Sequence, residues 1–177
     1  MPEFERLATL ISTRSLDERR TLVETARELS LANEHLRAAD LYDQILRDAE
    51  AGHYPLGRRL RAYVTHYRHF NRAHAGAESL SDTAQGFRRS LDQWPENALF
   101  WSRLVRADFY REDQEAALRA LREARAAVPA HPGKDMVLVA RTVRGLLRHD
   151  QIVPALEVWG DFQARLPFER EVEETLV

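Results

Sequence analysis

The sequence predicts an all-α protein built from antiparallel helix pairs. Only 7 Gly and 7 Pro occur among 177 residues, too few for a fold made of many strands and turns. Apolar residues recur three and four positions apart along nearly the whole chain, which is the period of amphipathic helices. Residues that end helices, such as Gly52, Pro95 and Pro129, separate these periodic stretches. We therefore expect helix and turn to alternate throughout one domain that spans residues 1–177.

The N-terminal stretch predicts three helices. Apolar residues at helical spacing predict a short capping helix over 3–13. The sequence Ser15-Leu-Asp-Glu18 has the form of a capping box, which predicts that a new helix begins there and runs to about residue 31. Asn33 then interrupts the pattern, and the next helix is expected over about 34–50.

The middle and the end of the chain predict further pairs. Pro55 precedes a long helix expected over about 56–74, and a partner helix is expected over about 79–93. Apolar stripes after Gly133 predict another pair that ends at Pro167. The tail, 168–177, places three apolar residues four positions apart, so we expect a last half-helix that caps the stack. These tail residues are Phe168, Val172 and Leu176.

The third pair carries the most specific pattern. Trp101 is followed by Leu104 three residues later, by Ala117 sixteen residues after the aromatic residue, by Ala124 seven later and by Pro129 five later. This order resembles the tetratricopeptide repeat (TPR) family. The resemblance implies a solenoid in which helix pairs stack into a right-handed α-α superhelix.

The other pairs follow the same register. The first packing position of each second helix holds a small residue, and a large residue follows four positions later. The small positions are Ala38, Thr83, Ala117 and Ala155. We expect repeat units over 19–52, 55–95, 97–129 and 134–167, with the capping segments 3–13 and 168–177. The alternative is a generic helical bundle, because every amphipathic helix has an apolar stripe.

The resemblance also implies where a ligand binds. In TPR proteins the first helix of each pair lines a concave surface that binds extended peptides, often through a terminal carboxylate held by basic side chains. Five residues after the aromatic position, this chain has Arg in all four pairs. Arg presents paired N–H donors that match a carboxylate. The candidate binding residues are Arg27, Arg68, Arg72, Arg106, Tyr110, Arg144 and Arg148.

We therefore expect a non-enzymatic adaptor or scaffold whose partner is another protein with an acidic or C-terminal peptide segment. One alternative is that the Arg residues only form a solvated face. A second is a basic-groove binder of RNA or nucleotide, since residues 51–77 contain five Arg and no acidic residue. However, Tyr67 and Phe70 are expected on the core side of their helix, so they would not stack on bases. A third is a structural subunit of a larger assembly, with its groove filled by its own or a neighbour's acidic tail.

A metal or a cofactor is not expected. His66 and His69 are one helical turn apart, but no carboxylate lies nearby in the sequence to complete a metal site or to orient one of the rings. His74 is expected to face the core. The chain has no Cys, which excludes disulfides, Cys-based zinc sites and thiol catalysis. No motif of a hydrolase or of a phosphate-binding loop occurs, so enzyme activity is not expected.

Charge and hydropathy bear on partners and compartment. The formal net charge is −2, so the overall charge does not favour nucleic acid. No apolar run approaches the roughly 18 residues of a membrane helix, and the N-terminus lacks the basic and apolar regions of a signal peptide. We expect a cytoplasmic protein. Lys134 is the only lysine among 26 basic residues, which is typical of a GC-rich bacterial genome.

Overall fold

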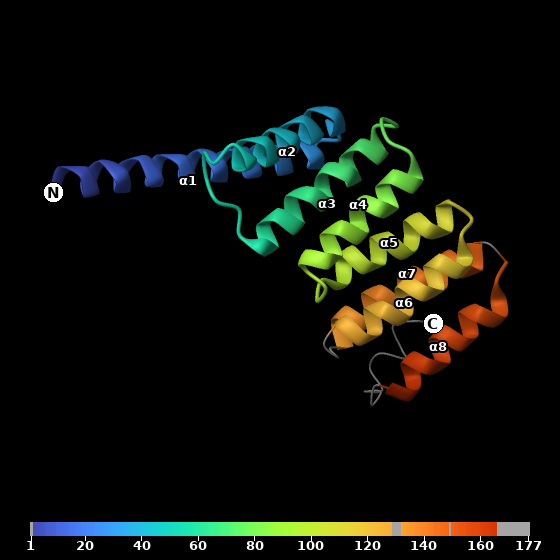
Figure 1. Ribbon diagram of the computed structural model, residues 1–177. Helices are drawn as coiled ribbons and strands as arrows, with labels where there is room; N and C mark the ends of the chain where they lie inside the picture. Colours follow the sequence, from blue (N-terminus) through green and yellow to red (C-terminus); the bar gives the residue numbers. More distant parts are fainter. Residues whose placement is uncertain (1, 129–131, 149, 166–177) are drawn as a thin grey trace. The chain divides into compact units, whose positions relative to one another are not determined.

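The computed structural model describes residues 2–128, 132–148 and 150–165, and in these it contains α-helices and no β-strand (Figure 1). The all-α prediction is confirmed. The helices are α1 (Pro2–Leu31), α2 (His35–Glu50), α3 (Arg58–His74), α4 (Leu80–Gln93), α5 (Ala98–Tyr110), α6 (Gln114–Ala127), α7 (Pro132–Arg148) and α8 (Ile152–Arg165). The chain divides into two compact units, Met1–Trp94 and Pro95–Val177, called unit 1 and unit 2 below. The prediction of a single domain stays a prediction.

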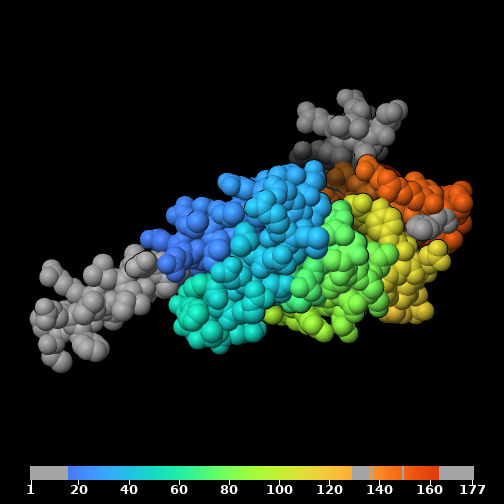
Figure 2. Space-filling model, turned by 90° about the horizontal axis from the view of Figure 1, so that it is seen from above, coloured from blue at the N-terminus to red at the C-terminus, as the bar shows by residue number. Residues whose placement is uncertain are grey.

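Unit 1 contains α1 to α4, and each helix packs on the next one along the chain. The apolar core between α1, α2 and α3 includes Tyr42, Ile45 and Val64, which have no exposed surface. The four helices pack on one another in chain order. In Figure 2 their coloured residues form a continuous surface from blue to green.

The first helix differs from its prediction. A break was expected at Ser15, but α1 is one continuous helix of 30 residues, and in Figure 1 its first half extends beyond α2. The stretch before Ser15 contains no Gly and only Pro2, which stands at the first helical position and costs no hydrogen bond there. The capping-box residues also form helices readily when no break precedes them. The boundary between a capping helix and the first repeat was therefore wrong.

Unit 2 contains α5 to α8. The helix α5 packs on both α6 and α7, and α7 also packs on α8, so the first helices of its two pairs are neighbours. Gly145 allows α7 to approach α5 closely, because an added Cβ would lie 2.8 Å from the ring of Phe109. The second helices are joined by an ion pair of 2.7 Å between Arg125 of α6 and Asp161 of α8.

The predicted packing register agrees with the observed burial. All four small positions are buried, namely Ala38, Thr83, Ala117 and Ala155. The large residue four positions later is buried in the first three pairs and partly buried in the fourth. Small side chains at these positions let the two helices of a pair lie close together.

The predicted breaks after α1, α2 and α5 are confirmed. Asn33, Glu112 and Gly52 adopt positive φ values of 63°, 62° and 82° where helices were expected to end. Asp113 caps the start of α6, since its side chain accepts a hydrogen bond from the Ala116 N–H at 2.9 Å. This hydrogen bond lowers the pKa of Asp113 below its ordinary value. The predicted ends at Pro129 and Pro167 and the predicted cap over 168–177 lie outside the described residues.

None of the helices in the described part of the chain combines the length and the apolar character that crossing a membrane requires.

Candidate functional site

The seven candidate binding residues all lie on the first helices of their pairs. Arg27 is on α1, Arg68 and Arg72 are on α3, Arg106 and Tyr110 are on α5, and Arg144 and Arg148 are on α7. The first three belong to unit 1 and the other four to unit 2. A single groove along all four pairs therefore stays a prediction.

In unit 1, two of the three Arg residues are engaged within the fold. Asp43 of α2 forms an ion pair with Arg68, whose Nε lies 2.9 Å from Oδ1, and accepts a hydrogen bond from Nη2 of Arg72 at 2.5 Å. These side chains are partly buried, so the pairing fixes α3 against α2. Arg27 is exposed. Arg68 and Arg72 consequently have a structural partner that the sequence did not reveal.

In unit 2, Arg106 and Tyr110 form one side of a cationic site on α5. The Tyr110 hydroxyl accepts from Nε and Nη2 of Arg106 at 3.2 and 3.0 Å, and the guanidinium also lies 5.1 Å from the centre of the ring. The hydrogen bond from Arg106 lowers the pKa of Tyr110 below its ordinary value, and Arg148 of α7 lowers it further. The tyrosine therefore joins Arg residues from two neighbouring helices.

Arg141 belongs to the same site, although the sequence interpretation did not select it. Partial burial lowers its pKa, and the charges of Arg103, Arg106 and Arg144 lower it further. Its guanidinium donates to the Ser102 hydroxyl at 3.2 Å. The spacing of three and four residues between positions 141, 144 and 148 places these side chains on one face of α7 and was the available signal.

We call Arg106, Arg141, Arg144 and Arg148 the Arg cluster. Within the residues that the structure describes, no carboxylate lies at ion-pair distance from any of these four side chains. Like charges this close repel one another, which favours an anionic group between them. A carboxylate or a phosphate is a group of this kind, because it accepts paired N–H donors from Arg.

An apolar pocket adjoins the Arg cluster on α7 and α8. Its volume is about 420 Å³, and its lining residues are Met136, Ala140, Val143, Arg144, Leu147, Arg148 and Trp159. Arg144 and Arg148 therefore border both the cluster and the pocket.

The two buried histidines of unit 1, His66 and His69, have structural roles. His69 is buried, and its Nδ1 lies 2.6 Å from Oε1 of Glu78, which holds the ring in place. The expectation that no carboxylate orients this ring was wrong, because Glu78 follows the turn after α3. His66 is fully buried and stacks on Phe87 at 4.2 Å between ring centres. Among the described residues no group of three or more His, Asp or Glu side chains is placed to hold a metal ion.

His74 also differs from its prediction. It was expected to face the core, but it is exposed near the end of α3. Its ring stacks on His35 of α2 with centres 5.0 Å apart and contacts Phe70 at 4.2 Å. His74 therefore covers the outer edge of the contact between α2 and α3.

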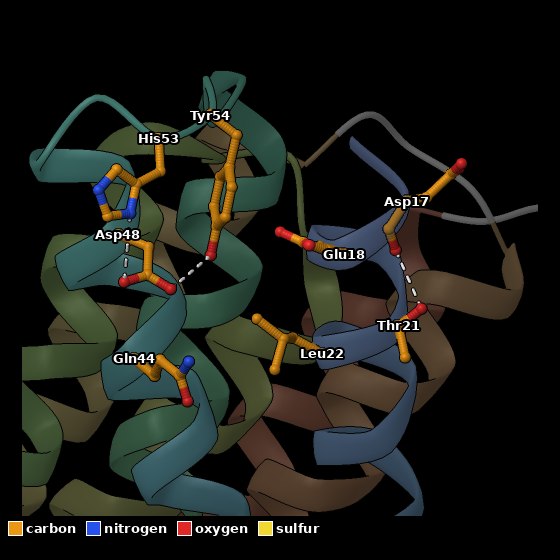
Figure 3. A pocket seen from close by; sticks show the side chains of 8 residues that line it. All are labelled: Asp17, Glu18, Thr21, Leu22, Gln44, Asp48, His53 and Tyr54. Atoms are coloured by element: carbon orange, nitrogen blue, oxygen red, sulfur yellow. Dashed lines mark hydrogen bonds and ion pairs between the residues drawn. The ribbon is translucent and has the colours of Figure 1, made fainter. Parts of the chain in front are cut away.

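A second pocket, of about 560 Å³, lies between α1, α2 and the turn that follows α2 (Figure 3). Asp17, Glu18 and Asp48 give it an acidic lining. The Tyr54 hydroxyl donates to Asp48 at 3.5 Å, and burial together with this carboxylate raises the pKa of Tyr54 to about 12. His53 Nδ1 lies 3.7 Å from the other oxygen of Asp48. Its acidic lining makes this pocket a poor site for an acidic peptide.

No known protein family matches this chain, and no curated protein matches it.

Proposed function

We propose that the chain is a TPR-like helical-repeat protein that binds an acidic peptide segment of another protein. Four stacked helix pairs would form the superhelix, and the Arg cluster of unit 2 would hold the ligand carboxylates. In this proposal the protein is an adaptor or scaffold and not an enzyme. The buried small positions and the contact between α5 and α7 support the stacked arrangement.

The observation that carries the proposal is the Arg cluster around Tyr110. Arg106 and Tyr110 are exposed on α5, and Arg144 and Arg148 are exposed on α7, the helix next to it. A ligand carboxylate would relieve the mutual repulsion of the Arg side chains and accept paired N–H donors. By contrast, Arg68 and Arg72 already share Asp43, so they are less available.

A nucleic-acid ligand is the second candidate, and the exposure of Tyr110 favours it. Tyr110 is 46% exposed and its ring lies beside the Arg106 guanidinium, an arrangement that can stack on unpaired bases. The first candidate is preferred because the chain carries a net charge of −2, whereas a nucleic-acid groove is usually extended and basic.

Fluorescence anisotropy with labelled short peptides rich in Asp and Glu tests the proposal. Replacing both Arg106 and Arg144 with Ala removes two charge-assisted contacts of about 1.5–3 kcal/mol each, so binding is expected to weaken more than about a hundredfold. The control replaces Arg89 and Arg122 with Ala. Both control residues are exposed on second helices outside the cluster, and their loss changes the net charge equally.

Thermal melts of both double variants check the fold, because exposed Arg side chains contribute little to stability. The proposal fails if the peptides bind the Arg106 and Arg144 variant as tightly as the wild type, or if the control variant weakens binding equally.

A further inference from the structure

The apolar pocket on α7 and α8 has no role in holding carboxylates, yet it shares two residues with the Arg cluster. Arg144 and Arg148 line it together with Met136, Val143, Leu147 and Trp159. A site that recognised only acidic groups would not need an apolar cavity beside its cations. The cavity is therefore expected to receive a group other than a carboxylate.

We infer that this pocket receives one bulky apolar side chain, Phe or Leu, from the same acidic segment that binds the Arg cluster. The inference rests on the proposed function and adds a sequence preference to it. The ligand is then an acidic segment with an apolar residue two positions from at least one Asp or Glu, and the apolar residue determines which acidic segments bind.

The size and lining of the pocket match such a side chain. Its volume of about 420 Å³ lies within the range of pockets that bind small molecules, roughly 300–1,000 Å³, and so the pocket has room for one Phe or Leu side chain. Trp159 offers a flat aromatic surface, and Met136 is flexible enough to adjust to ligands of different shape. Arg144 and Arg148 line the pocket and are exposed, an arrangement in which the aliphatic stems can extend the apolar wall while the charged ends stay in solvent.

The arrangement of charge identifies the occupant as an acidic peptide and not as a second copy of the chain. Side chains two positions apart in an extended peptide point to the same face and are about 6.6 Å apart, so a carboxylate two positions from the apolar residue lies near the pocket rim, where Arg144 and Arg148 are. Two copies that met through this face in a two-fold dimer would instead bring the same Arg residues close to their counterparts. That juxtaposition is repulsive.

The test measures the affinity of the full chain for acidic peptides that differ only at one central position, Phe, Leu, Ala or Ser. Phe and Leu are expected to bind at least about tenfold more tightly than Ala or Ser, because burial of a large apolar side chain stabilises the complex. Ala140→Phe, which fills the pocket, is expected to abolish the preference for Phe while the Ala peptide still binds.

A second variant guards against misfolding of Ala140→Phe. Leu147 is 51% exposed, so Leu147→Ala removes one wall of the pocket with little effect on folding, and it is expected to reduce the preference for Phe several-fold. The matched control is Leu156→Ala, since Leu156 is exposed on α8 and does not line the pocket. This control is expected to keep the wild-type preference.

The outcomes separate the inference from the proposed function. If all four peptides bind equally and the Arg106 and Arg144 variant still loses binding, the inference is wrong and the proposed function stands. If no acidic peptide binds, both are wrong. If Ala140→Phe changes only the self-association of the chain in sedimentation experiments, a second copy occupies the pocket and the inference is likewise overturned.

Discussion

Gly86 is the residue at which the packing of α3 against α4 leaves the least space. A Cβ at this position would overlap the imidazole ring of His69, which cannot move away because it is buried and held by Glu78. Gly86 lies in the middle of α4, where glycine is otherwise unfavourable. The absent side chain is therefore a requirement of the contact between the two helices.

Gly86→Ala is expected to lower the free energy of unfolding by about 1–3 kcal/mol, because the added methyl group forces the His69 ring or the helix to shift. The control is Gly160→Ala in α8, where an added Cβ meets no atom within 4 Å. That change is expected to be neutral or to stabilise the helix by up to about 1 kcal/mol. Urea denaturation of both variants is the measurement, and equal effects at the two glycines would contradict the account.

The burial of His69 predicts that the stability of the protein depends on pH. Burial lowers the pKa of His69, and the hydrogen bond to Glu78 opposes this without reversing it, while Arg68 and Arg89 add to the lowering. The unfolded chain then binds a proton at a higher pH, near 6.5, than the folded chain does. The contribution of His69 to the free energy of unfolding is therefore fully present above about pH 6.5. It is lost as the pH falls through the lower pKa that His69 has in the folded chain.

Denaturation curves between neutral and mildly acidic pH measure this effect. Replacing His69 with Gln is expected to flatten the dependence, because Gln keeps a donor for Glu78 and does not titrate. The same change at His53, which is largely exposed, is the control. A His69→Gln variant that retains the wild-type pH dependence would show that other groups cause it.

Asp43 connects two helices, α2 and α3. It forms ion pairs with both Arg68 and Arg72, and its removal leaves two partly buried guanidinium groups without this carboxylate. Asp43→Ala is therefore expected to lower the free energy of unfolding by about 1–3 kcal/mol. The loss should be near the low end of this range because the Arg side chains remain partly in solvent. Asp40→Ala, an exposed position on the same helix, is expected to change stability by less than about 0.5 kcal/mol. Chemical denaturation compares the two, and a neutral Asp43→Ala would refute the role of the bridge.

The sequence predicted most of the helices, because their signals are local. Apolar spacing defines each helix, and the breaks at Gly52, Asn33 and Glu112 follow from residues that end helices or tolerate positive φ. The start of the second helix was misplaced at Ser15 because a capping-box sequence is compatible with both a helix start and a helix interior. Helix ends depend on what precedes them as well as on the cap residues themselves.

The candidate site was harder to predict, because its contacts join residues that are far apart in the chain. Asp43 and Arg72 are 29 positions apart, so no local pattern indicates that they pair. Arg141 lies outside the set of Arg residues five positions after the aromatic position, although it shares one face of α7 with Arg144 and Arg148. The pocket that includes Trp159 depends on how α8 packs on α7, which periodicity alone does not determine.

At the scale of the whole molecule, the functional proposal depends on unit 2 alone. The Arg cluster and the apolar pocket both lie on helices of this unit, so they keep their geometry however unit 1 is placed. Unit 1 contributes Arg27 and a pocket of opposite charge near Asp17 and Asp48. The acidic segment of the proposal would therefore bind to unit 2.

A displacement titration tests whether the Arg cluster is a site for acidic peptides. A labelled acidic peptide with a central Phe, bound to the full chain, is competed with the same peptide unlabelled, with its Gln and Asn counterpart, and with single-stranded RNA. Carboxylate recognition predicts displacement by the acidic peptide, almost none by the amide peptide, and displacement by RNA only at higher concentration and low salt. Displacement by RNA at the lower concentration, or equal displacement by the amide peptide, would contradict the claim that the Arg cluster is a site for acidic peptides.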